Sequence, residues 1–271
     1  GHEQDGEEPE MRSLTTGATG MLAQQLNVEV ISNNIANMNT TGFKRQRAEF
    51  QDLLYQDLRR VGSDSSLNNT IVPTGVQVGV GVRTSAVYRI HEQGSMISTD
   101  NQLDIAIRGK GFFQVELPNG DTAYSRAGSF QINADGTIVT ADGYTVQPQI
   151  TVPQDALNIT INNAGQVSVQ LPAQVDPQVV GQLQLAVFPN DAGLESIGDN
   201  LLLETPASGA AAAGNPEADG FGSILQGYLE GSNVNSVQEI TSLITAQRAY
   251  ELNSKVIETS DEMMQTVSQL R

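Results

Sequence analysis

The sequence predicts an α+β protein, in which N- and C-terminal helices pack as a coiled-coil-like pair and the region between them forms a central all-β domain, a sandwich or distorted barrel. Two observations predict this class. Apolar residues recur with a helical period at both ends of the chain, and the middle consists of short apolar runs separated by turn dipeptides. The 271 residues, 38% of them hydrophobic, are enough to form a substantial core.

Residues 1–10 are predicted to be a disordered acidic extension. They contain five Asp and Glu and no Lys or Arg, a composition that offers little apolar surface to bury. Met11 resembles a natural start, so we interpret these ten residues as an extension upstream of it.

The N-terminal helix is predicted from Leu14 to Met38, in the first half of a terminal helical domain that spans residues 11–56. Its apolar residues follow a seven-residue repeat with half-heptad positions between them. This stripe consists of Leu14, Met21, Val28, Ile31, Ile35 and Met38. Gly42 is suited to a left-handed C-cap that would end the helix.

The C-terminal helix is predicted from about Ser236 to Leu270, in the second half of the same domain, residues 223–271. At 1.5 Å per residue it would be roughly 50 Å long. Its apolar stripe consists of Val237, Ile240, Leu243, Ile244, Tyr250, Val256, Ile257, Met263, Met264, Val267 and Leu270.

The central β domain is predicted to span residues 79–222, and residues 57–78 to connect it to the N-terminal helix. Strands are predicted at residues 103–107, 112–117, 129–132, 137–140 and 181–188, and a hairpin at 159–169. Asn-Gly, Asp-Gly and Ala-Gly pairs supply the positive φ angles of tight turns; they occur at Asn119-Gly120, Asp135-Gly136, Asp142-Gly143 and Ala164-Gly165. Residues 62–74 are predicted to be a polar loop and residues 208–222 a flexible linker or surface loop.

The charge balance limits the classes of partner. The net charge is −17, so phosphates would repel the chain, and neither nucleic acid nor insertion into a membrane is expected. The absence of Cys excludes disulfides, zinc–thiolate sites and thiol catalysis. We find no apolar stretch that would span a membrane and no cleaved signal peptide after Met11.

No catalytic, cofactor-binding or metal-binding site is predicted. His91 is the only His beyond residue 10 and lacks the further ligands that a metal ion needs, so we interpret it as a surface polar residue. Residues 133–136 lack the ligand spacing of a calcium loop and are interpreted as a hairpin turn. Asp104 lies inside an apolar run, where we expect it to tie the end of a strand.

The densest positive charge lies at Lys44-Arg45-Gln46-Arg47. Two interpretations remain open for this cluster. It is either a solvated turn after the N-terminal helix or a contact for an acidic face on a neighbouring copy of the chain.

The terminal helices carry more apolar surface than one helix pair can cover. Full burial of each large apolar side chain contributes roughly 1.5–3 kcal/mol, yet pairing buries only one side of each helix. The remaining faces are rich in amide and small polar residues, which pin the register between packed helices. The sequence therefore predicts an assembly subunit whose terminal helices polymerise and whose β domain faces outward.

Five motifs, which occur in order from residue 32 to residue 251, resemble those of bacterial flagellar basal-body rod and hook proteins, the axial family. They are residues 32–44 (SNNIANMNTTGFK), 104–113 (DIAIRGKGFF), 124–130 (YSRAGSF), 231–235 (GSNVN) and 247–251 (QRAYE). The motif residues of greatest interest are Asn33, Asn34, Asn37, Gly42, Phe43, Lys44, Asn233, Val234, Gln247, Arg248 and Glu251.

Within this family, residues 43–47, the segment 52–56 and the overall length look most like the members that form the distal rod. One departure is Leu202, where the family pattern usually has Tyr, so an apolar side chain is kept and a hydroxyl is lost. The resemblance further implies that residues 57–73, within this connecting segment, bridge neighbouring subunits. The residues expected to make this bridge are Leu58, Arg59, Arg60, Leu67, Ile71 and Val72.

The resemblance implies a structural role rather than an enzymatic one. Copies of the chain would polymerise into a rigid helical tube in the periplasm that transmits motor torque from the basal body to the hook. The partners implied are the chain itself, the proximal rod and hook proteins, the P-ring and L-ring proteins and the flagellar type III export apparatus, without any cofactor. Three alternatives remain: a proximal rod or hook subunit, a peptidoglycan-acting enzyme, and a secreted adhesin.

Overall fold

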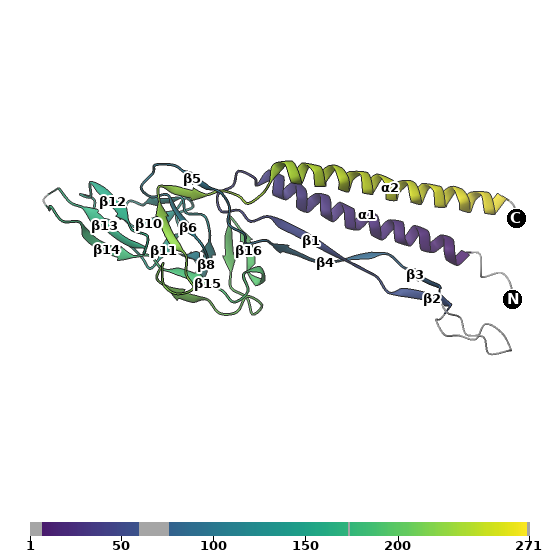
Figure 1. Ribbon diagram of the computed structural model, residues 1–271, viewed down its shortest axis with the longest axis horizontal. Helices are drawn as coiled ribbons and strands as arrows, with labels where there is room; N and C mark the ends of the chain where they lie inside the picture. Colours follow the sequence, from purple (N-terminus) through teal and green to yellow (C-terminus); the bar gives the residue numbers. More distant parts are fainter. Residues whose placement is uncertain (1–6, 60–75, 173, 270–271) are drawn as a thin grey trace. The chain divides into compact units, whose positions relative to one another are not determined.

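The structure, a computed structural model, describes residues 7–59, 76–172 and 174–269 (Figure 1). The chain divides into two compact units. The first contains residues 1–35, 46–88 and 236–271, and the second contains residues 36–45 and 89–235. Two terminal helices and a β-rich middle confirm the predicted α+β class. Neither described helix contains an apolar stretch long enough to cross a membrane.

Helix α1 spans Glu7–Ala36 and helix α2 spans Ser236–Gln269. The predicted range of α2 is confirmed. The prediction that residues 1–10 are disordered was wrong for residues 7–10, because α1 begins at Glu7. The helix dipole favours acidic residues in a first helical turn, and Pro is tolerated there. The helix also ends before Met38, and Gly42, although its φ is +70°, is not its C-cap.

Four strands complete the first unit. Strand β1 (Gln46–Asp52) pairs with β4 (Val82–Arg89), and β2 (Tyr55–Arg59) pairs antiparallel with β3 (Val76–Gly79). Both ends of the segment predicted to be a connection are therefore strands, because ladder pairing satisfies their backbone groups. Residues 60–75, which contain the whole of the predicted loop 62–74, lie outside the described residues.

The second unit is built around a nine-stranded sheet. Seven strands follow the order β16-β17-β8-β7-β11-β10-β9, and β15 pairs with both β7 and β18. The strands are β7 (Phe112–Glu116), β8 (Thr122–Ser125), β9 (Phe130–Ile132), β10 (Ile138–Thr140), β11 (Thr145–Gln147), β15 (Leu185–Val187), β16 (Glu195–Gly198), β17 (Leu201–Leu203) and β18 (Ala212–Gly214). A short 3-10 helix, Asp191–Gly193, precedes β16.

Three smaller sheets belong to the same unit. Strands β12 (Asn158–Ile161), β13 (Gln166–Gln170) and β14 (Gln178–Gln182) form an antiparallel sheet. Strand β6 (Ile105–Arg108) pairs with β19 (Ser223–Gln226), and β5 (Met96–Ser98) pairs with β20 (Tyr228–Glu230). The pairing of β6 and β5 with strands near the C-terminal helix joins segments more than 100 residues apart.

The turn dipeptides predicted the hairpins correctly. Gly120, Gly136, Gly143 and Gly165 all have φ between +79° and +88°, and strands flank each of them. The predicted strand 181–188 is in fact the end of β14 and all of β15, because the Leu183 N–H leaves the ladder and donates to the Gly165 carbonyl.

The predicted flexible linker 208–222 was wrong in part. It contains β18, in which Ala213 pairs with Ala186 of β15, and it starts with the fully buried Ser208. The Ser208 hydroxyl donates to the Thr205 carbonyl oxygen at 2.8 Å. Small side chains allow this close strand approach, whereas a composition-based argument treats Ala, Gly and Pro as signs of a linker.

The core of the second unit consists of two apolar clusters. The larger contains Ile105, Ile107, Phe113, Phe130, Ile138, Val146, Ile150, Val152, Ile161, Val167, Val169, Leu183, Leu185 and Ile224. The smaller contains Phe112, Tyr124, Ala186, Phe188, Leu194 and Leu202. Leu202, the position at which the family pattern usually has Tyr, is therefore a core residue.

Candidate functional site

A buried ion cluster lies in the second unit, where Glu230 accepts hydrogen bonds from two cations. Lys44 Nζ lies 2.5 Å from Glu230 Oε1, and Arg126 NH2 lies 2.7 Å from Glu230 Oε2. All three side chains are at least 93% buried. Burial lowers the pKa of Lys44, while the charge of Glu230 opposes this shift. Lys44 is thus neither a solvated turn residue nor a contact for another copy, which corrects both interpretations of the Lys44–Arg47 cluster for this residue.

The remaining donors of the cluster bind backbone carbonyl oxygens. Arg126 donates to the carbonyls of Ile107, Gly109 and Gly111 at 2.7–3.1 Å, and Lys44 Nζ donates to the Glu92 carbonyl at 2.7 Å. Burial of ions is costly unless their hydrogen-bonding capacity is satisfied. Here each charged group has several partners, so the cluster holds its surroundings in one arrangement.

The cluster brings together segments that contain or adjoin four of the sequence motifs. Lys44 belongs to the first motif, Arg126 to the third, and the carbonyls that Arg126 binds to the second. Glu230 precedes the fourth motif, in which the Asn233 side chain accepts from the Arg45 N–H at 2.7 Å and donates to the Ile90 carbonyl at 2.8 Å. The motif residues thus have a physical role in common, because their side chains and backbone carbonyls form one buried hydrogen-bond network.

Sequence reasoning missed this network. A charged residue within an apolar or Gly-rich motif, such as Arg126 between Ser125 and Ala127, signals burial with a partner. The partner, Glu230, could not be identified, because it is 104 residues away along the chain.

His91 lies beside the cluster and is not the surface residue that the sequence predicted. Its ring contacts Phe112 edge-on, with 5.7 Å between ring centroids, and Nδ1 is buried without a hydrogen-bond partner. Burial, together with the positive charges of Lys44, Arg89 and Arg126, lowers the pKa of His91 to about 4. The imidazole is therefore neutral at physiological pH.

Other sequence interpretations are confirmed in the second unit. Asp104 precedes β6, forms a β-bridge with Ser129, and accepts a hydrogen bond from Asn101. Residues 133–136 form a turn in which Asn133 Oδ1 accepts from the N–H groups of Asp135 and Thr137.

In the first unit, α1 and α2 contact each other in antiparallel orientation. Ser13 and Ser260 hydroxyls lie 3.0 Å apart, and Asn34 Nδ2 donates to Glu239 Oε2 at 3.1 Å. The contact face between these pairs contains small and polar residues. A Cβ added to Gly20 would lie 2.8 Å from Asn253 Nδ2, so the two backbones approach closely there.

The seam between the helices thus combines predicted stripe residues, such as Ile257 against Gly17, with polar contacts that the apolar pattern did not predict. Residues 13, 20 and 34 of α1 face 260, 253 and 239 of α2. These positions are separated by seven and then by fourteen residues, which is one and two heptads. Asn34 is fully engaged, since its Oδ1 also accepts from the Gln46 N–H at 2.8 Å. Asn34 and Asn253 thus lie within the helix pair, not on the remaining faces where the sequence placed them, and their amide groups fix the register of the pair.

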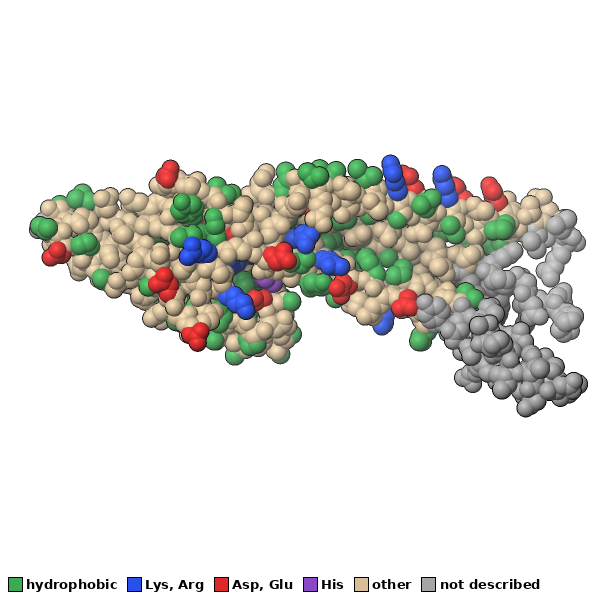
Figure 2. All heavy atoms as spheres, in the orientation of Figure 1, with side chains coloured by type: hydrophobic (Ala, Val, Ile, Leu, Met, Phe, Trp, Pro, Cys, Tyr) green, Lys and Arg blue, Asp and Glu red, His purple; other side chains and the backbone are tan. Residues whose placement is uncertain are grey.

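The predicted stripe residues divide by burial. Ile31 is buried; half-buried are Leu14, Met21, Val28, Ile35, Leu243, Ile257 and Met264; exposed are Met38, Tyr250, Val256 and Met263. The side chain of Val267 lies outside the described residues. Helix α2 therefore carries an exposed apolar stripe, made of Val237, Ile240, Ile244, Tyr250, Leu252, Val256 and Met263. Figure 2 shows apolar side chains among charged ones on the helices.

A groove of about 710 Å³ opens beside this exposed stripe, between the two helices. It is lined by Gln25, Val28, Gln247, Tyr250 and Glu251. The first unit therefore exposes apolar and amide side chains beside this groove.

The remaining motif and bridging residues occupy varied positions. Phe43 is buried, Asn37 accepts from the Thr40 hydroxyl, and Val234 is half-buried. Asn33, Arg248 and Glu251 are exposed. Leu58 and Arg59 lie in β2, whereas Arg60, Leu67, Ile71 and Val72 lie outside the described residues.

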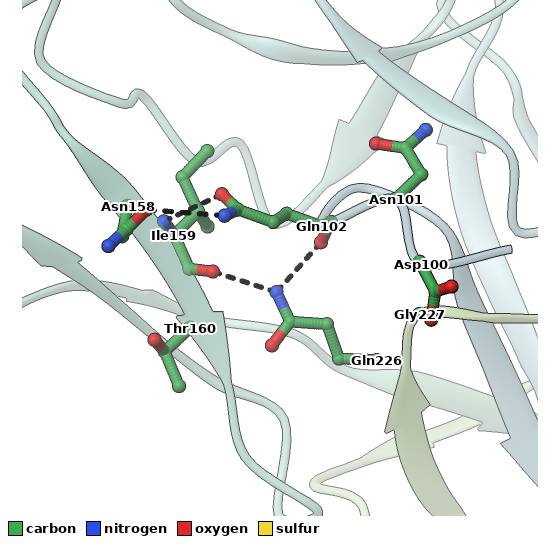
Figure 3. Close-up of a pocket in the computed structure, with 8 residues that line it drawn as sticks. All are labelled: Asp100, Asn101, Gln102, Asn158, Ile159, Thr160, Gln226 and Gly227. Carbon is green, nitrogen blue, oxygen red and sulfur yellow. Dashed lines mark hydrogen bonds between the residues drawn. The ribbon is translucent and has the colours of Figure 1, made fainter.

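A polar pocket of about 400 Å³ lies at the outer edge of β12 (Figure 3). Gln226 Nε2 donates to the carbonyls of Ile159 and Gln102, both at 2.8 Å, and Gln226 Oε1 accepts from the Ile161 N–H. The Gln226 side chain thus satisfies backbone hydrogen-bonding groups at the edge of β12. Among the residues that line the pocket, Asp100 alone is titratable, and no three metal-ligating side chains converge among the described residues.

Comparison with known families identifies three matching regions. Residues 14–44 match the model described as flagella basal body rod protein, residues 106–169 the flagellar hook protein FlgE/F/G D1 domain, and residues 225–270 the flagellar basal body rod FlgEFG protein C-terminal region. The buried ion cluster draws Lys44, Arg126 and Glu230 from all three regions.

Individual relatives are similar over nearly the whole chain. The flagellar basal-body rod protein FlgG of Caulobacter vibrioides is 64% identical over 96% of this chain and 100% of its own length. The proteins of the same name from Agrobacterium fabrum and Bacillus subtilis are 57% and 40% identical, over 95% and 96% of this chain and 98% and 99% of their own lengths.

Proposed function

The chain belongs to the FlgG family of flagellar basal-body rod proteins, and on this premise we propose that it is a distal rod subunit that polymerises into a rigid helical tube. The tube transmits motor torque from the basal body to the hook. The observation that carries the proposal is the exposed apolar stripe of α2. Its large apolar side chains are exposed along the helix from Val237 to Met263, and one of them, Tyr250, also lines the groove between the helices; monomeric proteins rarely leave many such side chains exposed together.

The two faces of α2 differ in residue type, and this difference supports assembly. One face, with Ala246, Asn253 and Ser260, meets or faces α1 and is small and polar. The other face carries Val237, Ile244 and other large apolar side chains that are exposed in the single chain. Burial of these side chains by neighbouring copies would contribute roughly 1.5–3 kcal/mol each.

We infer finer features of the architecture from the same contacts. The antiparallel helices pack as a coiled-coil-like pair, and the sheets of the second unit enclose the core as a distorted sandwich. The interface between copies includes the predicted stripe residues that do not face the partner helix of the same chain, and residues 57–73 bridge neighbouring subunits.

The partners proposed follow from membership of the rod family. They are further copies of the chain, the proximal rod and hook proteins at the two ends of the tube, the P-ring and L-ring proteins around it, and the type III apparatus that exports the subunit. The proposed location is the rod between the periplasm and the outer membrane.

Electron microscopy of the purified full-length chain, with the chain concentration raised stepwise, tests the proposal. We expect straight hollow tubes above a threshold concentration and a folded monomer below it. The proposal would be contradicted if the chain stayed monomeric at every concentration while hydrogen exchange showed that the second unit is folded.

A further inference from the structure

The second unit has an uneven distribution of charge. Residues 111–235 contain 13 Asp and Glu but a single basic residue, Arg126, and that residue is buried against Glu230. Apart from Glu230 and the half-buried Asp191, all of these carboxylates are exposed. The surface formed by these residues therefore carries charge of one sign.

The exposed positive charge of this unit is confined to one loop. Lys44 is buried, and Arg45 and Arg89 are half-buried, whereas Arg108 and Lys110 are exposed. Neither Arg108 nor Lys110 makes an ion pair with any residue that the structure describes. Two cations thus stand beside an otherwise acidic surface.

The backbone of this loop is held from inside the unit. Arg126 binds the carbonyl oxygens of Ile107, Gly109 and Gly111, the residues on either side of each cation. The Lys110 carbonyl also accepts from the Gly222 N–H at 2.7 Å, and the Gly109 N–H donates to Gln93 Oε1 at 3.1 Å. The loop is fixed, so binding through its side chains would lose little backbone entropy.

We propose that the loop 107–111, which we call the cationic loop, binds the acidic surface of the second unit of a neighbouring copy. This inference rests on the proposed assembly and names a contact within it. Acidic surfaces brought together in a dense array repel one another, and a fixed pair of cations relieves that repulsion at a defined place. The loop and the acidic surface are different patches, so the contact is head-to-tail, the kind that generates open helical assemblies.

A contact of this kind was one of the two interpretations that the sequence left open for Lys44–Arg47. Lys44 is buried in the ion pair with Glu230, and Arg126, which also binds Glu230, holds the cationic loop in place. The buried cations therefore position the exposed ones.

The test compares two charge reversals of equal size. The variant R108E/K110E reverses the cationic loop, and the control R47E/R83E makes the same change in net charge at exposed positions of the first unit. Sedimentation measures the lowest concentration at which each full-length chain forms tubes, at low and at high NaCl. Hydrogen exchange of β6 and β7 checks that the second unit stays folded.

We expect R108E/K110E to need on the order of tenfold more protein than the wild type at low salt, since exposed pairs contribute a few-fold each and reversal adds repulsion. High salt screens the charges of the cationic loop and of the acidic surface, so it should narrow this difference, while the control stays close to the wild type at both salt concentrations. Tube formation by R108E/K110E at the wild-type threshold would overturn the inference alone. Failure of the wild type to form tubes would overturn the proposed assembly and this contact with it.

Discussion

At the scale of single residues, the most constrained group is Glu230, which holds two cations from distant parts of the chain. Neither Lys44 nor Arg126 has water available to replace this carboxylate, because all three side chains are buried. A buried ion pair contributes little net stability over an apolar replacement, yet loss of one member leaves an uncompensated charge. The cluster therefore specifies one arrangement of the motif segments.

The substitution Glu230→Gln is expected to destabilise the second unit by about 3–5 kcal/mol, because it leaves two buried cations without a counter-ion. Urea unfolding followed by hydrogen exchange of β6 and β20 measures the loss. Glu217→Gln removes an exposed carboxylate and should change stability little. Equal stability of the two variants would contradict the role given to Glu230.

His91 predicts a pH dependence with a definite sign. Its pKa is lowered from 6.5 to about 4 in the folded chain, so the unfolded chain binds the proton first as the pH falls. The stability that this group contributes is full above pH 6.5 and decreases as the pH falls from 6.5 to 4, with no further loss below.

The comparison of wild type with His91→Gln isolates this effect. Urea midpoints measured from pH 7.5 to 4 should fall more steeply for the wild type than for the variant. Parallel curves would show that His91 titrates normally in the folded state.

At the scale of elements, the two faces of α2 have different tasks. Ile257 faces α1, where its Cγ1 lies 3.0 Å from the position that a Cβ on Gly17 would occupy. The neighbouring Val256 is 46% exposed and belongs to the exposed apolar stripe of α2, its outer stripe. Adjacent residues of one helix thus separate folding of the subunit from its assembly.

We expect Val256→Asp to stop tube formation without changing the helix content of the monomer, because the new charge meets water in the single chain and an apolar neighbour only in the assembly. Ile257→Asp should reduce helix content as well, since it disturbs the contact with α1. Circular dichroism of the monomer and sedimentation of the assembled chain distinguish the two. Normal tubes from Val256→Asp would show that the outer stripe is not an interface.

Most elements could be predicted because their signals are local. Asn-Gly and Asp-Gly pairs identified the hairpins, and the apolar repeat identified both helices. The features that were missed depend on contacts between distant residues. Strand β18 depends on β15, the burial of Lys44 depends on Glu230, and the polar seam of the helices became visible only when residue 13 was placed opposite residue 260. The residue pattern within one segment does not indicate which distant segment it will contact.

At the scale of the whole molecule, stiffness is the property that distinguishes a torque-transmitting shaft from a flexible hook. The segment expected to supply it, residues 57–73, starts in β2 and is followed by β3, which pairs with β2. Pairing of β2 with β3 places Arg59 opposite Val76, so the residues that flank 60–75 are held together. A segment held in this way can restrict sliding between neighbouring copies.

We therefore expect deletion of residues 62–72 to permit tubes but to make them curved or flexible, because bridging contacts between copies are lost. Curvature in electron micrographs measures the effect, and the undeleted chain is the control. Straight tubes after the deletion would show that the segment is only a solvated connection.

The central claim is that the outer stripe of α2 is buried between copies, and the absence of Cys from the chain allows a direct measurement. The variant Val256→Cys carries a single thiol on that stripe, whose rate of reaction with a maleimide is compared in the monomer and in preassembled tubes. The account predicts a thiol that reacts quickly in the monomer and is strongly protected in the tubes. Equally fast reaction in both states would contradict it.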